Sequence, residues 1–270
     1  MAQAIWVDEL FQLELGLWAQ LQKLKGRQWI LSGDQFQFSA LFDQWKGTAV
    51  PEDTLLKSRL LHQLCGGNRI TLTQCRRSER ELFEWYASLV PGQPLRERAL
   101  PDVLREARAR FSFQGPARHN LVLSHRRRVR INAQCMQAFK PDVGARFIRA
   151  GPERGQLNAA QNLYVWVGLE LLGCSRNSKK IRNNVLYTVK EVQEAAVVVV
   201  SEGGETISLT DAQVAEMLRL SFARTYASCQ GTEFDGTLRL WDCQNRNFTH
   251  KHLYVALSRA KAAHLIDIAA

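Results

Sequence analysis

Two carboxylates, Asp8 and Glu9, come directly after the short apolar stretch from Ala4 to Val7. At the end of a β-strand, such a pair suits phosphate chemistry, because one carboxylate can hold Mg²⁺ through water while the other orients an attacking water. The alternative is a helix-start signal, since carboxylates favour the positive end of a helix. Taken alone, the pair favours this second interpretation.

A further carboxylate, Asp34, follows the apolar stretch Trp29 to Leu31 in the run Gly33-Asp34-Gln35-Phe36-Gln37. If the two apolar stretches are neighbouring parallel strands, their ends place Asp8 and Asp34 near each other at one edge of a sheet. Gln37 would then be placed to sense the terminal phosphate of a nucleotide. A plain Gly-Asp turn is the alternative, and the two interpretations are evenly balanced on these residues.

An arginine, Arg77, follows a third expected strand, Arg69 to Leu72. At the same sheet edge, an arginine can stabilise the charge of a phosphoryl-transfer transition state. A surface charge or salt bridge is the alternative, because most arginines lie on the surface. Arg76 is adjacent, so the choice between the two arginines stays open.

Two C-terminal segments carry a resemblance. They are Ala223 to Asp235, with the sequence ARTYASCQGTEFD, and Leu253 to Lys261, with the sequence LYVALSRAK. The two resemble motifs V and VI of superfamily-one helicases of the RecD-like type, and motif VI is the more specific. The likeness runs in order from Asp8 to Arg259.

The resemblance implies a site for ATP and Mg²⁺. It assigns the metal and water roles to Asp8 and Glu9, phosphate sensing to Gln37, and arginine-finger roles to Arg77 and Arg259. It places Glu233 near the nucleotide, and Gln230 and Gly231 at phosphates or at the nucleic-acid backbone. We also expect Asp34 at the nucleotide.

The resemblance also implies single-stranded nucleic acid as a partner, with DNA expected and RNA possible, and movement from 5′ to 3′. Thr225, Arg126, Arg127 and Trp166 are the expected contacts to the strand. Aromatic stacking on a base is worth about 1 to 3 kcal/mol. Core packing is the expected fate of at least one of Trp166 and Tyr164, and a solvated helix face is the alternative for the arginine run that begins at Arg126.

Two departures from the family pattern stand out. The phosphate-binding sequence G-x-x-x-x-G-K-S/T does not occur in the chain, and Ala227-Ser228 replaces the usual His-Lys of motif V. We therefore expect the isolated chain to be inactive toward ATP, and we expect the missing N-terminal half of the motor to precede Met1. A helicase-derived module that binds nucleic acid without catalysis and a protein-binding scaffold are the alternatives.

The elements that must position these residues follow from the apolar patterning. Strands alternating with helices predict an α/β chain with two RecA-like parallel-sheet units, the first incomplete, and a small β-rich, SH3-like insertion in the second. The expected domains are residues 1–92 (partial RecA-like domain 1), 93–117 (linker helix), 118–150 with 206–270 (RecA-like domain 2), and 151–205 (insertion).

Helices are expected where apolar residues recur at three- and four-residue steps. One is expected from Leu10 to Leu24, one around Thr54 to Cys65, and one with its apolar side formed by Val129, Ala133 and Met136. Capping boxes are predicted for Ser78 with Glu81 and for Thr210 with Gln213. A strand is expected from Arg219 to Arg224.

The composition is that of a globular protein, with 46% hydrophobic and 23% charged residues. The 36 Lys and Arg outnumber the 26 Asp and Glu, which gives a formal charge of +10 and favours a polyanionic partner. No apolar run approaches the roughly 18 residues of a membrane span, and the six cysteines are scattered. These features predict a soluble intracellular protein.

Overall fold

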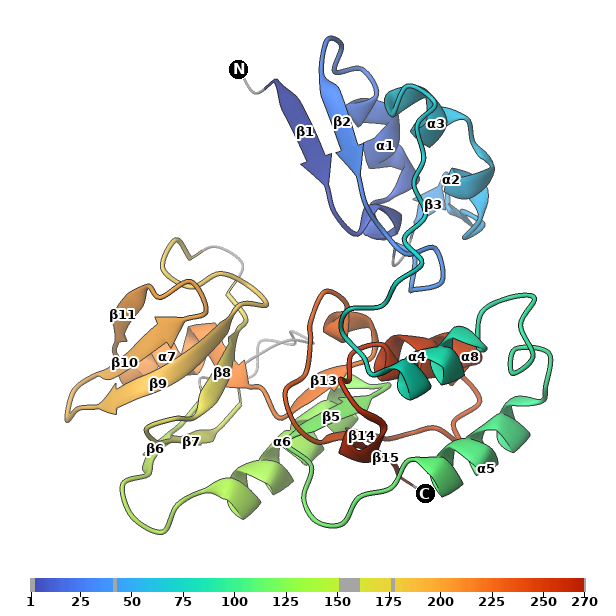
Figure 1. The fold of residues 1–270 in the computed structure, drawn as a ribbon. Helices are drawn as coiled ribbons and strands as arrows, with labels where there is room; N and C mark the ends of the chain where they lie inside the picture. Colours follow the sequence, from blue (N-terminus) through green and yellow to red (C-terminus); the bar gives the residue numbers. More distant parts are fainter. Residues whose placement is uncertain (1–2, 41–42, 151–160, 176–177, 270) are drawn as a thin grey trace. The chain divides into compact units, whose positions relative to one another are not determined.

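The computed structural model describes residues 3–40, 43–150, 161–175 and 178–269. The chain divides into two compact units (Figure 1). Unit 1 consists of Met1–Glu106, Gln230–Glu233 and Thr249–Ala263, and unit 2 consists of Ala107–Cys229, Phe234–Phe248 and His264–Ala270. No helix among the described residues is long and apolar enough to cross a membrane.

Unit 1 begins with two parallel strands, β1 (Ala4–Val7) and β2 (Gln28–Leu31), as the apolar stretches predicted. The single helix expected from Leu10 to Leu24 is wrong, because the chain forms a short 3-10 helix, η1 (Leu10–Gln12), and then α1 (Leu15–Leu21). A tertiary contact marks the start of α1, where the backbone N–H of Leu15 donates to the Asp43 carboxylate (2.9 Å). The buried centre of this region is formed by Leu10, Trp18 and Leu55.

Short elements complete unit 1: the hairpin β3 (Gln44–Trp45) and β4 (Thr48–Ala49), and the helices α2 (Thr54–Lys57), α3 (Leu60–Leu64), α4 (Arg80–Ala87) and α8 (His250–Leu257). The helix expected around Thr54 to Cys65 is two helices, because Ser58 between them has an extended backbone. The strand expected from Arg69 to Leu72 does not form, and Ile70 and Leu72 are 88% and 90% exposed. Helix α5 (Leu100–Arg110) carries the chain from unit 1 into unit 2.

The capping box predicted for Ser78 and Glu81 is also wrong. Helix α4 begins at Arg80, with Glu79 as its N-cap and no side-chain capping bond. The Ser78 hydroxyl donates to the carbonyl of Ala260 instead (2.7 Å). The Ser78 hydroxyl therefore makes a tertiary contact and does not accept a hydrogen bond from the first turn of α4.

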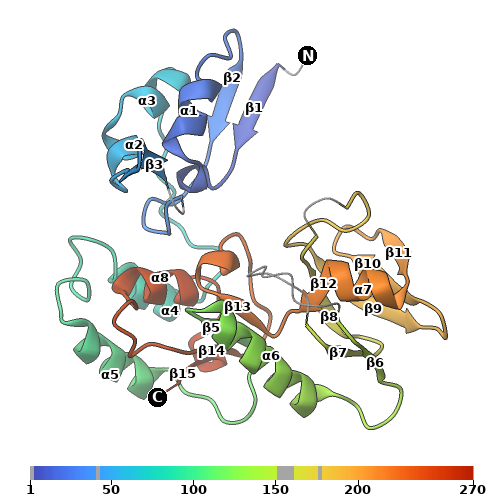
Figure 2. The same cartoon turned by 180° about the vertical axis from the view of Figure 1, so that it is seen from behind.

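Unit 2 contains a four-stranded parallel sheet in the order β13 (Ala223–Thr225), β5 (His119–Val122), β14 (Leu238–Leu240), β15 (Ile266–Ile268). With the parallel pair in unit 1, it confirms the α/β fold class. Helix α6 (His125–Phe139) packs beside β5 and β13 (Figures 1 and 2).

The buried face of α6 differs from the expected one. Val129 is 38% exposed, whereas Arg128, Ile131, Asn132 and Met136 are buried. Asn132 faces the sheet in place of Val129, and its Oδ1 accepts a hydrogen bond from the backbone N–H of Ala223 (2.8 Å) on the edge strand β13. A buried backbone donor has to be satisfied, and this amide satisfies it.

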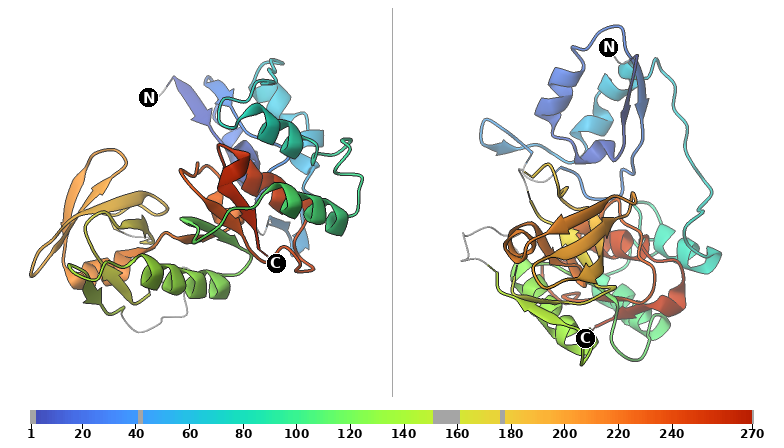
Figure 3. Two further views of the ribbon diagram at one scale, coloured as in Figure 1. Left: turned by 60° about the horizontal axis from the view of Figure 1, so that its bottom comes forward. Right: turned by 90° about the vertical axis from the view of Figure 1, so that its left-hand side faces the viewer.

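A second, antiparallel sheet of unit 2 has the order β11 (Thr206–Leu209), β10 (Val197–Ser201), β9 (Leu186–Val192), β8 (Glu170–Gly173), β12 (Leu218–Leu220). Its strands are strongly bent (Figure 3), as the twist of a sheet allows. Helix α7 (Asp211–Met217) connects β11 to β12, and β6 (Arg146–Ile148) pairs separately with β7 (Leu163–Val165). Two short 3-10 helices complete the unit, η2 (Ala227–Cys229) and η3 (Ala263–Leu265), the second starting at the unit boundary.

This β-rich region reaches beyond residue 205, the expected end of the insertion, since β11 and β12 belong to its sheet. Residues 151–160, the expected beginning of the insertion, lie outside the described residues. The strand expected from Arg219 to Arg224 is divided between the two sheets: Leu218–Leu220 pairs with β8, and Ala223–Thr225 pairs with β5. The Ser221 hydroxyl, which donates to the Glu170 carbonyl (2.7 Å), marks the crossing.

Candidate functional site

The carboxyl ends of β1 and β2 meet at Asp8. Its Oδ1 accepts hydrogen bonds from the Ser32 hydroxyl (2.7 Å) and from the backbone N–H of Glu9 (2.9 Å). Glu9 has a left-handed backbone (φ 51°, ψ 44°), which is uncommon for a residue other than glycine. The two acidic segments are thus side by side at one sheet edge.

Asp34 is a junction between distant parts of unit 1. Its Oδ1 accepts from the backbone N–H of Phe36 (2.9 Å), and its Oδ2 accepts from the Tyr254 hydroxyl (2.7 Å) and from Gln37 Nε2 (3.3 Å). Tyr254 lies on α8, and its ring packs edge-on against Phe36 and Tyr86, with ring centroids 6.3 and 5.7 Å away. Asp34 therefore joins the Gly-Asp segment to the helix of motif VI.

Gln37 is 8% exposed, and its amide is oriented by Asp34. A carboxylate only accepts hydrogen bonds, so Nε2 must face it and Oε1 must point elsewhere. Among the described residues, Oε1 is buried and has no hydrogen-bond partner. A buried acceptor left unsatisfied costs about 1 to 3 kcal/mol, so this oxygen is suited to receive a water or a ligand donor.

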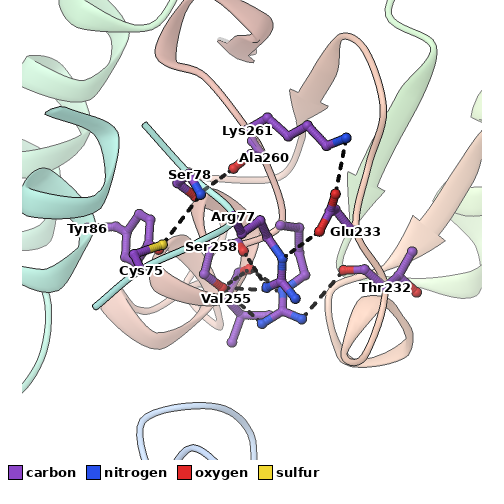
Figure 4. Close-up of polar contacts among 11 residues, drawn as sticks. Cys75, Arg77, Ser78, Tyr86, Thr232, Glu233, Val255, Ser258, Ala260 and Lys261 are labelled. Atoms are coloured by element: carbon purple, nitrogen blue, oxygen red, sulfur yellow. Dashed lines mark hydrogen bonds and ion pairs between the residues drawn. The ribbon is translucent and has the colours of Figure 1, made fainter. Parts of the chain in front are cut away.

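Arg77 and Lys261 both bind one carboxylate, that of Glu233 (Figure 4). Arg77 Nε donates to Glu233 Oε2 (3.1 Å), and Lys261 Nζ lies 3.2 Å from Oε1. Arg77 Nη1 also donates to the carbonyl of Ser258 (3.0 Å). The hydrogen bond from Lys261, followed by that from Arg77, lowers the pKa of Glu233 below its ordinary value, so the carboxylate is ionised at neutral pH.

Arg259 is only 2% exposed and is held at the end of α8. Its guanidinium donates to the carbonyl of Val255 (3.4 Å), to the Ser258 hydroxyl (3.1 Å from Nη2) and to the carbonyl of Thr232 (3.5 Å). Burial raises the pKa of Glu9, whereas the positive charge of Arg259 lowers it. The pKa of Glu9 lies above its ordinary value, because burial outweighs the opposing charge of Arg259.

The segment that carries Gln230 and Gly231 lies against the Gly-Asp segment. Gln230 Nε2 donates to the carbonyl of Phe38 (3.1 Å), and the Phe38 ring packs edge-on against His252, with centroids 4.7 Å apart. Gly231 has a φ of 73°, a conformation that glycine adopts without a steric penalty. Gln230, Gly231 and Glu233 of motif V and the residues of motif VI are thus in the same unit as the Gly-Asp segment, whereas Thr225 of motif V lies in unit 2.

The unit holds carboxylates and cations of the kinds that Mg²⁺ and phosphates require. The described residues hold no group of three or more His, Cys, Asp and Glu side chains placed to bind a metal ion. Magnesium does not require one, because it is usually bound through one or two carboxylates together with waters and phosphate oxygens. Asp8 suits the carboxylate role, and Arg77, Arg259 and Lys261 supply positive charge for phosphates.

Residues 168–266 match the family model described as the viral superfamily 1 RNA helicase core domain. Among solved structures, the chain is similar to Bacteroides Pif1 bound to single-stranded DNA (18% identity, TM-score 0.67), covering 99% of this chain and 70% of that chain. The chain has the fold of a superfamily 1 helicase.

Two further helicase structures agree. The Pif1 helicase from Candida albicans gives 15% identity and a TM-score of 0.64, with 99% of this chain and 72% of that chain covered. Bacteroides Pif1 in complex with ADP-AlF3 and single-stranded DNA gives 19% identity and a TM-score of 0.62, with 99% and 70% covered. A search of curated proteins found no match. The likeness to superfamily 1 helicases predicted from the motifs is confirmed.

In this helicase fold, the residues predicted to contact nucleic acid all lie in unit 2. Arg126 is exposed at the start of α6, whereas Arg127 lies near Asp242 (3.5 Å) and over the ring of Trp241 (5.1 Å). Thr225 is 7% exposed, and its hydroxyl is hydrogen-bonded to the Ser228 hydroxyl (2.9 Å). Their contacts to a strand stay predictions.

Two expectations about side-chain burial are resolved in the same unit. Trp166 and Tyr164 are both partly buried against the core of the β-rich region. Arg128, which belongs to the arginine run expected on a solvated face, is 1% exposed. Only part of that run is therefore available to a polyanion.

Sequence reasoning missed Tyr254 and Lys261 as site residues. Both lie inside the segment that resembles motif VI, so that segment was the available signal. Their partners, Asp34 and Glu233, come from other parts of the chain. Spacing along the sequence does not predict such pairs.

Proposed function

We propose that this chain is the C-terminal part of an ATP-dependent helicase motor, which couples ATP hydrolysis to movement along single-stranded nucleic acid and to duplex unwinding. The supporting observation is the assembly of Glu9, Asp34, Gln37, Arg77 and Arg259 within one unit. A module that only binds nucleic acid has no need of carboxylates and arginines gathered in this way.

The roles proposed for the residues follow from their surroundings. Asp8 would hold Mg²⁺, which neutralises phosphate charge when bound. Glu9 would orient the attacking water. The unsatisfied Oε1 of Gln37 would accept a hydrogen bond from that water, since Asp34 orients the amide for it.

Positive charge for the transition state would come from Arg77 and Arg259, in the manner of arginine fingers. Gln230, Gly231 and Glu233 would lie beside the nucleotide. Asp34 would act indirectly, because both of its oxygens already accept hydrogen bonds from protein donors.

The phosphate-binding sequence G-x-x-x-x-G-K-S/T is absent from the printed sequence, so we propose that another polypeptide segment supplies it. Such a segment would contribute backbone N–H groups and a lysine for the phosphates. Without it, we expect the chain to turn over ATP hardly at all. The segment would precede Met1 in the gene or belong to a partner.

The nucleic acid is DNA in our first proposal, since the Bacteroides Pif1 structures contain single-stranded DNA. RNA is the second candidate, because the matching family model describes viral RNA helicases. Thr225, Arg126, Arg127 and Trp166 would contact the strand in either case. Binding of DNA and RNA strands of the same sequence to the chain distinguishes the two.

The decisive experiment is an ATPase assay on the chain joined to the segment encoded upstream of it. We expect hydrolysis stimulated by single strands, and a loss of about 10³ to 10⁵ fold in R77A. R80A is the matched control, because Arg80 is an exposed arginine that pairs with Glu84 along its own helix. A stop codon directly upstream, or no hydrolysis by the joined protein, would instead favour the non-enzymatic binding module. Equal hydrolysis rates in R77A and the parent protein would refute the finger role of Arg77.

A further inference from the structure

Glu233 is a carboxylate whose two oxygens are each held by a different cation. Oε2 accepts from Arg77 Nε (3.1 Å), and Oε1 lies 3.2 Å from Lys261 Nζ (Figure 4). The cations are far apart in the sequence, since Arg77 precedes α4 and Lys261 follows α8. This is the arrangement in which two oxygens of a phosphate would be bound.

A third cation lies next to this pair. Arg77 donates to the carbonyl of Ser258, and Arg259 donates to the hydroxyl of the same Ser258. Arg259 also donates to the carbonyl of Thr232, the residue before Glu233. Three cations are thus linked through two short backbone segments, with one carboxylate directly between two of them.

Another anion can readily replace the Glu233 carboxylate in its two ion pairs. The side chains of Arg77, Glu233 and Lys261 are 35%, 43% and 43% exposed. Ion pairs with such exposure contribute little to stability, because water screens them. A phosphate chain carries more charge than a carboxylate and suits the fork of an arginine, so it competes well for the same cations.

We propose that Glu233 is an internal substitute for a phosphate group: it holds Arg77 and Lys261 in position until a polyphosphate displaces it, and Lys261 is then a further phosphate-binding residue. Identifying that polyphosphate as the phosphates of ATP rests on the function proposed above. The displacement itself depends only on the cluster. Glu233 thereby lowers the affinity for the ligand while keeping the cations preorganised.

The test is calorimetric titration of the folded chain with inorganic tripolyphosphate at low salt. We expect E233Q to bind about two- to fivefold more tightly than the parent chain, because a competing charge is removed. K261Q should bind more weakly by a similar factor, and K261R should recover part of the loss. E84Q is the matched control, because it also removes a carboxylate paired with an arginine (2.7 Å), and it should leave the affinity unchanged.

Three results would overturn the proposal: no binding of tripolyphosphate to the parent chain, E233Q binding no more tightly than E84Q, or K261Q binding like the parent chain. These results are separable from a failure of the proposed function. If the affinities follow the expected order while the chain joined to its upstream segment hydrolyses no ATP, only the proposed helicase function is refuted. If the joined protein hydrolyses ATP but E233Q has unchanged affinity, only the role of Glu233 is lost.

Discussion

At the scale of single residues, Asp34 shows how a charged group can act through its neighbours. Its carboxylate accepts hydrogen bonds from Phe36, Gln37 and Tyr254. The Tyr254 hydroxyl is part-buried, and burial together with the Asp34 charge raises its pKa, so it remains a donor at neutral pH. We therefore expect Tyr254 to act as a positioning residue, because it donates to the same Asp34 oxygen as the Gln37 amide.

Replacing Tyr254 with Phe removes that donor and keeps the ring. We expect the free energy of unfolding to fall by about 1 to 2 kcal/mol, because the lost hydrogen bond ends on a charged acceptor. Urea unfolding measures it, and a double-mutant cycle with D34N isolates the pair. A coupling energy near zero between the two substitutions would show that the contact contributes nothing.

At the scale of secondary-structure elements, two similar sequence patterns have different outcomes. Thr210 and Gln213 form the predicted capping box of α7: the Thr210 hydroxyl accepts from Gln213 N (3.3 Å), and Gln213 Oε1 accepts from Thr210 N (3.0 Å). Ser78 and Glu81 do not: α4 begins one residue later, with Glu79 as its N-cap, and the Ser78 hydroxyl donates to the carbonyl of Ala260. The same local pattern thus caps one helix and not the other.

The cap of α7 should be worth a measurable amount. We expect T210A to lower the free energy of unfolding by about 1 kcal/mol, because one donor at the helix start loses its acceptor. T210S keeps a hydroxyl at this position and should retain most of the stability. Equal unfolding midpoints in urea for T210A and T210S would show that the hydroxyl does not stabilise the helix.

At the scale of the whole molecule, the charge of +10 sets how the chain meets a polyanion. Binding to a single strand releases about 0.7 counterion for each phosphate contacted, so affinity falls as salt rises. Buried arginines such as Arg128 and Arg259 are not accessible to an approaching strand. Exposed arginines such as Arg126 are the candidates for phosphate contacts that release counterions.

Fluorescence anisotropy with a labelled single strand across a salt series tests this view. We expect a negative slope of log affinity against log salt, and R126Q should reduce its magnitude by about 0.7 if Arg126 contacts one phosphate. R80Q, in unit 1, removes the same charge and is the control. Binding that ignores salt, or equal effects of R126Q and R80Q, would argue against a phosphate contact at Arg126.

Much of the fold is predictable from the sequence because its signals are local. The apolar stretches at β1 and β2 predict strands and their parallel pairing, and the Thr210 pattern predicts the start of α7. The prediction of a single strand from Arg219 to Arg224 was wrong, because the two halves of this segment pair with strands in different sheets. The predicted buried face of α6 was also wrong, because the buried Asn132 side chain accepts a hydrogen bond from the backbone of the edge strand β13.

By itself, the sequence determined the types and order of the chemical groups: two acidic strand ends, a glutamine, and arginines in segments that resemble helicase motifs. Only the tertiary structure decided which of them meet. Tyr254 donates a hydrogen bond to Asp34, and Lys261 and Arg77 both pair with Glu233. These contacts form because packing brings together segments that are far apart in the chain. Such pairs depend on how whole elements pack against one another, and the spacing of side chains within one element does not predict that packing.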